Sequence, residues 1–113
     1  MELAYEGLIT IEDFSRMDLR VGVILSVEEV PKSKKLLHLR VDFGEVLGTK
    51  TVMAGVKAAA PVVGQRVLAV VNLPPRMMAE VMSEAMLLAT HCANGALTLA
   101  TIAADAEAGA KLG

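Results

Sequence analysis

Residues 72–90, NLPPRMMAEVMSEAMLLAT, mark the place where the sheet of this chain must open. The apolar run 67–71 that precedes them and the run 86–89 near their end are each typical of a buried strand. Pro74 and Pro75, between the two runs, remove two successive backbone donors and cannot lie inside a central strand. The segment therefore predicts two strands that are joined by a loop.

The composition favours one small β-rich domain. The chain has 113 residues, of which 54% are hydrophobic and only 3% aromatic, so its core must be aliphatic. So much apolar sequence in a small chain also predicts self-association, with a homodimer as the expected state. No apolar run approaches the roughly 20 residues of a membrane helix, and the first residues lack a secretory pattern. With Cys92 as the single cysteine, we expect a cytoplasmic protein without disulfides or membrane contact.

Alternating apolar and polar residues predict two half-buried strands, at residues 19–28 and 37–43. In the second strand, His38 and Arg40 lie on the face opposite to the apolar side chains. Gly22 is a candidate for a bulge in the first strand. Further strands are expected at residues 49–56, 66–73, 85–90 and 97–102.

The connections complete the expected fold. Residues 44–48 are expected to form a hairpin loop, and Asn94-Gly95 is a strong hairpin signal. Thr10 can cap a short helix, and residues 57–60 predict a helical turn. This order predicts an all-β fold, a five-stranded OB-fold barrel with a short N-terminal helix and a helical turn between strands 3 and 4. We expect residues 1–9 to form an N-terminal arm and residues 10–113 a single domain.

Charge is segregated along the chain, although the net charge is only −2. Residues 1–30 hold two basic and seven acidic side chains, and residues 79–113 hold one and four. The middle, residues 31–78, holds eight basic and two acidic side chains. A local basic face attracts phosphate whatever the total charge. The alternative is a solvated face that acidic neighbours balance in the fold.

Nothing in the sequence predicts catalysis. The chain has no Gly-rich phosphate loop, no Ser/His/Asp set and no metal-ligand spacing, so we expect no enzyme, no metal and no cofactor. His91 and Cys92 form one adjacent pair of reactive types, which cannot make a closed zinc site and more simply ends a strand.

Five short motifs, taken together, resemble the tRNA-binding domain that is attached to bacterial methionyl-tRNA synthetases. The same domain occurs in stand-alone dimeric tRNA-binding proteins and in the chaperone CsaA. The resemblance covers residues 11–112, and its motifs are IEDF with DLRVG at 11–22, VPKSKKL at 30–36, VDFG at 41–44, NLPPR at 72–76 and SEAMLL at 83–88. It implies an OB-fold, a homodimer made through the N-terminal helix and C-terminal segments, and binding of tRNA by shape and backbone.

The resemblance also implies a set of tRNA-binding residues. Lys32 and Lys35 would contact phosphates, and His38 and Arg40 would extend the basic track. Asn72 would contact sugar or base, although its amide could equally hold the loop. The family's basic, hydroxyl and apolar contacts fall on Arg76, Ser83 and Met86, of which Met86 could instead belong to the core.

A second function stays open beside tRNA binding. Pro74 stands where the tRNA binders often have lysine, which is more like CsaA, and Glu80 would repel a nearby phosphate. Flexible, polarizable methionine side chains fit irregular surfaces, although they also fill gaps. Under a CsaA-like chaperone hypothesis, Met77, Met78 and Met82 would bind unfolded or presecretory polypeptides.

Overall fold

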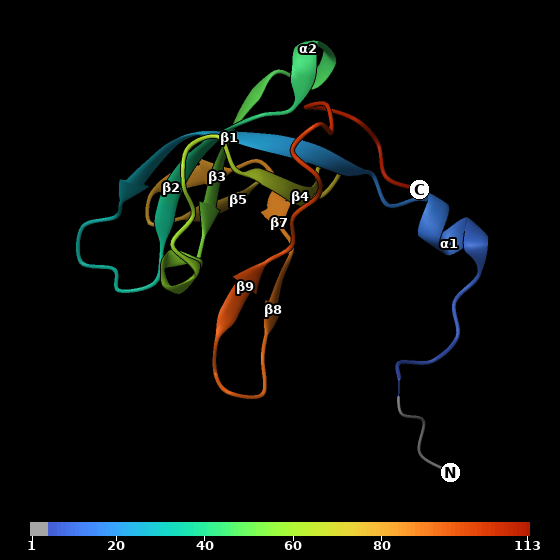
Figure 1. The fold of residues 1–113 in the computed structure, drawn as a ribbon, viewed down its shortest axis with the longest axis horizontal. Coiled ribbons are helices and arrows are strands. Elements are labelled where there is room, and N and C mark those ends of the chain that lie inside the picture. Colours follow the sequence, from blue (N-terminus) through green and yellow to red (C-terminus); the bar gives the residue numbers. More distant parts are fainter. Residues whose placement is uncertain (1–4) are drawn as a thin grey trace.

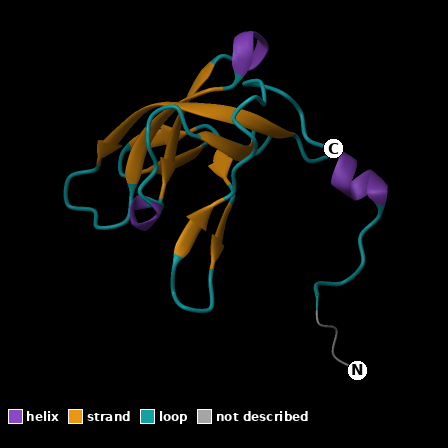
Figure 2. Cartoon of the chain, in the orientation of Figure 1, coloured by secondary structure: helices purple, strands orange, loops and turns teal. Residues whose placement is uncertain are grey.

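The computed structural model describes residues 5–113 and consists mainly of antiparallel strands (Figures 1 and 2). Five strands form one curled sheet in the order β3-β2-β1-β4-β7. Their bounds are β1 Leu19–Glu29, β2 Leu37–Asp42, β3 Thr49–Ala54, β4 Arg66–Val70 and β7 Met86–Leu87. Two hairpins are separate, β5 Arg76–Met78 with β6 Val81–Ser83, and β8 Ala89–His91 with β9 Leu97–Leu99. The helices are α1 Ile11–Ser15, α2 Gly44–Leu47 and the 3-10 turn η1 Lys57–Ala59.

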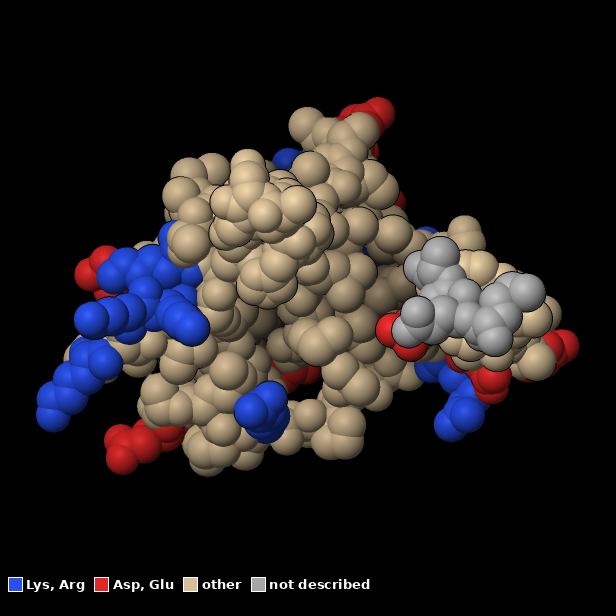
Figure 3. Space-filling model, turned by 90° about the horizontal axis from the view of Figure 1, so that it is seen from below, with Lys and Arg blue, Asp and Glu red and all other residues tan. Residues whose placement is uncertain are grey.

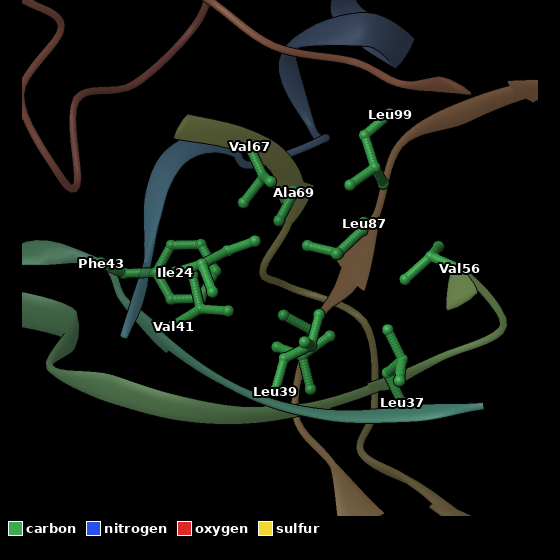
Figure 4. Packing of buried hydrophobic residues seen from close by; sticks show 12 residues of the cluster. Ile24, Leu37, Leu39, Val41, Phe43, Val56, Val67, Ala69, Leu87 and Leu99 are labelled. Carbon is green, nitrogen blue, oxygen red and sulfur yellow. The ribbon is translucent and has the colours of Figure 1, made fainter. Parts of the chain in front are cut away.

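The core lies inside the curled sheet (Figure 4). Leu37, Leu39 and Val41 of β2 are buried while the residues between them are not, as the alternation predicts. Phe43 follows β2 and packs against Gly22, where an added Cβ would lie 2.8 Å from its ring. Gly22 therefore makes room for the ring. The bulge that we expected at Gly22 lies further along, between Ile24 and Ser26.

The edges of the sheet, β3 and β7, are joined through the residues that precede β7. The hydroxyl of Ser83 accepts a hydrogen bond from the backbone of Met53 at 2.9 Å. The carboxylate of Glu84 accepts one from the backbone of Thr51 at 2.7 Å, and the Glu84 N–H donates back to the Thr51 carbonyl at 2.9 Å. These bonds satisfy backbone groups on the outer edge of β3, which closes the fold as an OB-like barrel.

The segment between β4 and β7 is more regular than the sequence predicts. The expectation of a simple loop after β4 is wrong, because β5 and β6 pair there as a hairpin. Its two turn residues, Ala79 and Glu80, have φ of 48° and 68°, the left-handed pair of a tight hairpin turn. Neither is glycine or asparagine, so the sequence carries no turn signal. The hairpin loop expected at 44–48 is likewise wound into the single helical turn α2.

The N-terminal helix has the expected cap and buries none of its residues. The backbone N–H of Asp13 donates to the hydroxyl of Thr10 at 3.1 Å, and the Asp13 carboxylate accepts from Thr10 in return. In Figure 1, α1 stands away from the barrel at the end of the N-terminal segment. Of the arm expected at residues 1–9, residues 1–4 lie outside the described part, and residues 5–9 form neither helix nor strand.

The C-terminal tail is hydrogen-bonded to the backbone of the first residues of β1, which the sequence did not predict. Gly109 donates to the carbonyl of Val21 at 2.7 Å, and Leu112 donates to that of Leu19 at 2.8 Å. Arg20 also holds the tail against β1, since its guanidinium forms an ion pair with Asp18 at 2.6 Å and donates to the Gly109 carbonyl at 3.0 Å. The hydrogen bond from Arg20 lowers the pKa of Asp18.

None of the helices in residues 5–113 has the length and apolar character that a membrane-spanning helix requires.

Candidate nucleic-acid interface

The loop between β1 and β2 carries the densest positive charge of the chain. Lys32, Lys34 and Lys35 are all exposed, and Figure 3 shows Lys and Arg gathered at this end of the molecule. The hydroxyl of Ser33 accepts from the backbone of Leu36 at 2.9 Å, which shapes the turn. Within residues 5–113 the structure gives these lysines no ion pair, so their charge is available to a ligand.

The loop continues onto the outer face of the sheet. Arg40 is exposed on β2, and its guanidinium donates to the hydroxyl of Thr51 on β3 at 2.6 Å. His38 is half-buried on the same face, between Glu28 on β1 and Met53 on β3. The alternation along β2 thus puts the predicted residues His38 and Arg40 on one face of the strand, and the loop with Lys32 and Lys35 leads into the start of that strand.

A further lysine joins this end of the molecule. The backbone N–H of Lys57, the first residue of η1, donates to the carbonyl of Lys35 at 3.1 Å. The Lys57 ammonium pairs with the carboxylate of Glu29 at 2.8 Å, and that hydrogen bond lowers the pKa of Glu29. Sequence reasoning missed Lys57 because it is far from the basic loop along the chain. No local pattern reports such a neighbour.

Asn72 holds the fold together at the end of β4. Its amide oxygen accepts from the backbone of Asp18 at 3.0 Å, and its amide nitrogen donates to the carbonyl of Arg16 at 2.7 Å. Both ends of the amide are therefore engaged with the segment that links α1 to β1. Of the two readings that the sequence left open, the structure supports the loop-holding hydrogen bond.

The hydroxyl of Ser83, expected to contact RNA, faces the protein instead. Ser83 has an exposed fraction of only 6%, and its hydroxyl lies between the backbone N–H and carbonyl of Met53. A buried hydroxyl with these partners is part of the barrel closure. The contact of Ser83 with RNA stays a prediction, and we leave Ser83 out of the proposed interface.

Arg76 and Met86 border a cavity of about 530 Å³ beside the β5–β6 hairpin. Arg76 is exposed at the start of β5, and Met86 is exposed on β7 and not part of the core. Met78 is half-buried and also lines this cavity, whereas Met77 and Met82 face each other across the hairpin in the open, at 59% and 44% exposure. Met77 and Met82 therefore do not fill a gap under the loop.

Metal-ligand geometry does not occur in the described part of the chain. No group of three or more His, Cys, Asp or Glu side chains there could hold a metal ion. Cys92 is a free, exposed thiol next to the β8–β9 turn, 3.9 Å from the hydroxyl of Thr98.

Known proteins share both this fold and this sequence pattern. Methionine–tRNA ligase of Porphyromonas gingivalis is 41% identical over 107 residues, which cover 92% of this chain. The chain spans only about 15% of that enzyme's length. A MetRS-related protein from Pyrococcus horikoshii has a similar structure, with a TM-score of 0.85 at 27% identity over 95% of this chain and 99% of that one.

A chaperone has the same fold. CsaA from Bacillus anthracis str. Ames has a TM-score of 0.83 at 32% identity, over 95% of this chain and 100% of that one. Residues 19–111 match the model of the tRNA binding domain family, which is most of the sequence. With the OB-like barrel, the motifs of the sequence and this match in agreement, the chain belongs to the tRNA binding domain family.

Proposed function

We propose that this chain is a structure-selective tRNA-binding protein that acts as a homodimer and stands alone from any catalytic domain. The observation that carries the proposal is the exposed basic loop with Lys32 and Lys35, which have no ion pair in the described structure and continue into Arg40. Its fold is that of a tRNA-binding domain and not of a catalytic one. A place in the cytoplasm, where tRNA is found, is part of the proposal.

Binding proceeds through phosphates and shape. Lysines gain affinity when they neutralise phosphates and release the counterions of the RNA, which requires no particular base. Stacking on aromatic platforms is the usual alternative in OB-folds. Here Phe43 is buried in the core, while Tyr5 and Phe14 lie on the N-terminal segment and α1, so the sheet face offers no such platform. Selectivity then comes from how the backbone of a folded RNA matches the basic end of the barrel.

The exposed apolar residues of the N-terminal segment support the homodimer. Single exposed apolar residues are ordinary on a protein surface, whereas a group of them marks an interaction site. The members of this group are Tyr5, Leu8, Ile9, Ile11, Phe14 and Met17. Because α1 buries none of its residues within its own chain, a second copy is the proposed cover.

The proposal is tested by a tRNA-binding titration at about 50 and 200 mM salt, with unfractionated tRNA as the ligand. Lys35→Gln removes one phosphate contact and should weaken binding and lower the slope of log affinity against log salt by roughly one unit. Lys111→Gln is the matched control, since Lys111 lies in the C-terminal tail, where its backbone forms a β-bridge with Arg20, outside the proposed interface. Equal slopes for both variants would remove the basic loop from the interface, and no binding of wild-type protein at 50 mM would remove tRNA as the ligand.

A second candidate function is polypeptide binding. It is supported by the 32% identity to the CsaA chaperone of Bacillus anthracis and by the open methionine pair, Met77 and Met82. Thioether side chains adapt to varied apolar partners. A protein that binds no tRNA but suppresses aggregation of an unfolded client, and loses this with Met77→Ser and Met82→Ser, would decide for the chaperone.

A further inference from the structure

The cavity beside the β5–β6 hairpin has no role in the proposed phosphate contacts of Lys32, Lys35 and Arg40. It is formed between the end of β3, the β5–β6 hairpin, β7 and the β8–β9 hairpin. Its volume of about 530 Å³ is within the range of small-ligand pockets, roughly 300–1,000 Å³. Most of its wall is aliphatic or thioether, including Met53, Val56, Met78, Met86, Leu88 and Leu97.

Two cationic or titratable side chains also line this apolar space. Arg76 comes from β5 and His91 from β8, and both are exposed. The structure gives neither side chain a hydrogen bond or ion pair to another residue in the range 5–113. The third polar side chain of the lining is Ser83, whose hydroxyl is already hydrogen-bonded to the backbone of Met53. The cavity therefore combines an apolar interior with donors that have no partner within the fold.

The cavity also adjoins the basic loop. Val56 lines it, and the next residue is Lys57, whose backbone is hydrogen-bonded to Lys35. Positive charge thus lies near the cavity, with Arg76 in its lining and Lys35 joined to the neighbouring turn, where the Lys57 ammonium is paired with Glu29. An anionic chain that contacts Arg76 therefore lies at the cavity.

We propose that this cavity receives one unpaired base of the bound RNA, while the phosphates next to that base contact Arg76 and the lysines. The inference rests on the proposed function and names the RNA feature that the site selects. Bases that are not paired in a helix can be turned out and held by protein side chains. In this cavity Met53, Met78 and Met86 offer polarizable sulfur to a base in place of the missing aromatic rings.

The charge at the cavity favours RNA over a presecretory polypeptide. Secretory segments begin with a positively charged region before their apolar stretch. Such a region would be repelled by Arg76 and the nearby lysines, whereas a phosphate would be attracted. The polypeptide is therefore the outcome that contradicts the inference.

The test fills the cavity without a change in charge. An added Cβ at Gly55 meets no atom within 4 Å, and Gly55 and Ala89 both line the cavity and are exposed. Gly55→Leu and Ala89→Leu should therefore fold. Ala104→Leu is the matched control, at an exposed tail residue that does not line the cavity. The probes are unfractionated tRNA and a fully paired RNA duplex of similar length, each titrated at about 50 and 200 mM salt.

Both filling variants should bind tRNA at least about fivefold more weakly, the lower end of what one held base contributes. Their salt slope and their affinity for the duplex should equal those of Ala104→Leu, because no phosphate contact is lost. Unchanged tRNA affinity in both variants overturns the inference, and so does an equal loss for tRNA and duplex. Loss of aggregation suppression with tRNA binding intact would assign the cavity to a polypeptide. If the wild-type protein binds no tRNA in the salt titration, the proposed function itself is wrong. That result is distinct from a wild-type protein that binds tRNA and filling variants that bind it equally well, which overturns only the role of the cavity.

Discussion

Polar side chains of the segment between β4 and β7 serve the fold. Asn72 holds the link between α1 and β1, while Ser83 and Glu84 hold the open edge of β3. Sequence motifs fixed which residues stand there but not where their hydrogen bonds go, because a serine or asparagine can serve either a ligand or the backbone. Burial separates these two roles for Ser83, and burial is a property of the complete fold.

Ser83→Ala should lower the free energy of unfolding by about 1–3 kcal/mol, since it leaves buried backbone groups of Met53 without their partner. Urea denaturation measures this. Ser26→Ala is the control, at a half-buried residue of β1 for which the structure gives no side-chain hydrogen bond, and it should stay within about 0.5 kcal/mol of wild type. Unchanged stability together with a loss of tRNA affinity would return Ser83 to the RNA interface.

The helix α1 and the segment before it form the element with the least support from its own chain. Thr10 and Asp13 predicted the helix through their capping pattern, and the structure has that capping box. The same local signal says nothing about what the helix packs against. Its exposed apolar residues are the reason for the proposed homodimer, as no described residue of α1 is buried.

Ile11→Glu should therefore dissociate the homodimer and leave the barrel folded. Ile11 is 70% exposed, and an acidic residue is favourable in the first turn of a helix, so α1 itself should persist. Burial of an isoleucine side chain is worth about 1.5–3 kcal/mol, so two copies raise the dimer dissociation constant by about a hundredfold or more. Sedimentation equilibrium measures the mass.

The control for this element is Val46→Glu, since Val46 is 98% exposed on α2, away from α1. It should sediment with the mass of two chains, as wild type should. A wild-type protein with the mass of one chain, or an Ile11→Glu protein that stays a dimer, would contradict the proposed role of α1.

The two separate hairpins show which turns can be predicted from the sequence and which cannot. Asn94-Gly95 predicted the β8–β9 hairpin, because these residue types adopt left-handed backbone angles readily, and Gly95 has φ of 87°. Ala79 and Glu80 both have positive φ in the β5–β6 turn although neither is a residue of that kind, so this hairpin could not be predicted. The hydrogen bonds between the C-terminal tail and β1 could not be predicted either, since pairing of a few residues leaves no periodic pattern in the sequence.

At the scale of the whole molecule, charge is arranged more sharply than the net value of −2 suggests. Figure 3 shows a group of basic side chains at the end that holds the β1–β2 loop, whereas both basic and acidic side chains are seen at the end that holds the N-terminal segment. The segregation along the sequence predicted such a face, because the basic residues cluster within one part of the chain. The sequence could not place Lys57 beside Lys35, nor reveal the cavity between this loop and Arg76.

The proposed interface is tested most directly by mapping the tRNA contact on the protein. Amide chemical shifts of isotope-labelled protein would be followed by NMR as unfractionated tRNA is added at about 50 mM salt. We predict that the largest changes fall in the β1–β2 loop, at His38 and Arg40 of β2, and at Arg76. Changes confined to the β8–β9 turn and the C-terminal tail, with the basic loop unaffected, would contradict it.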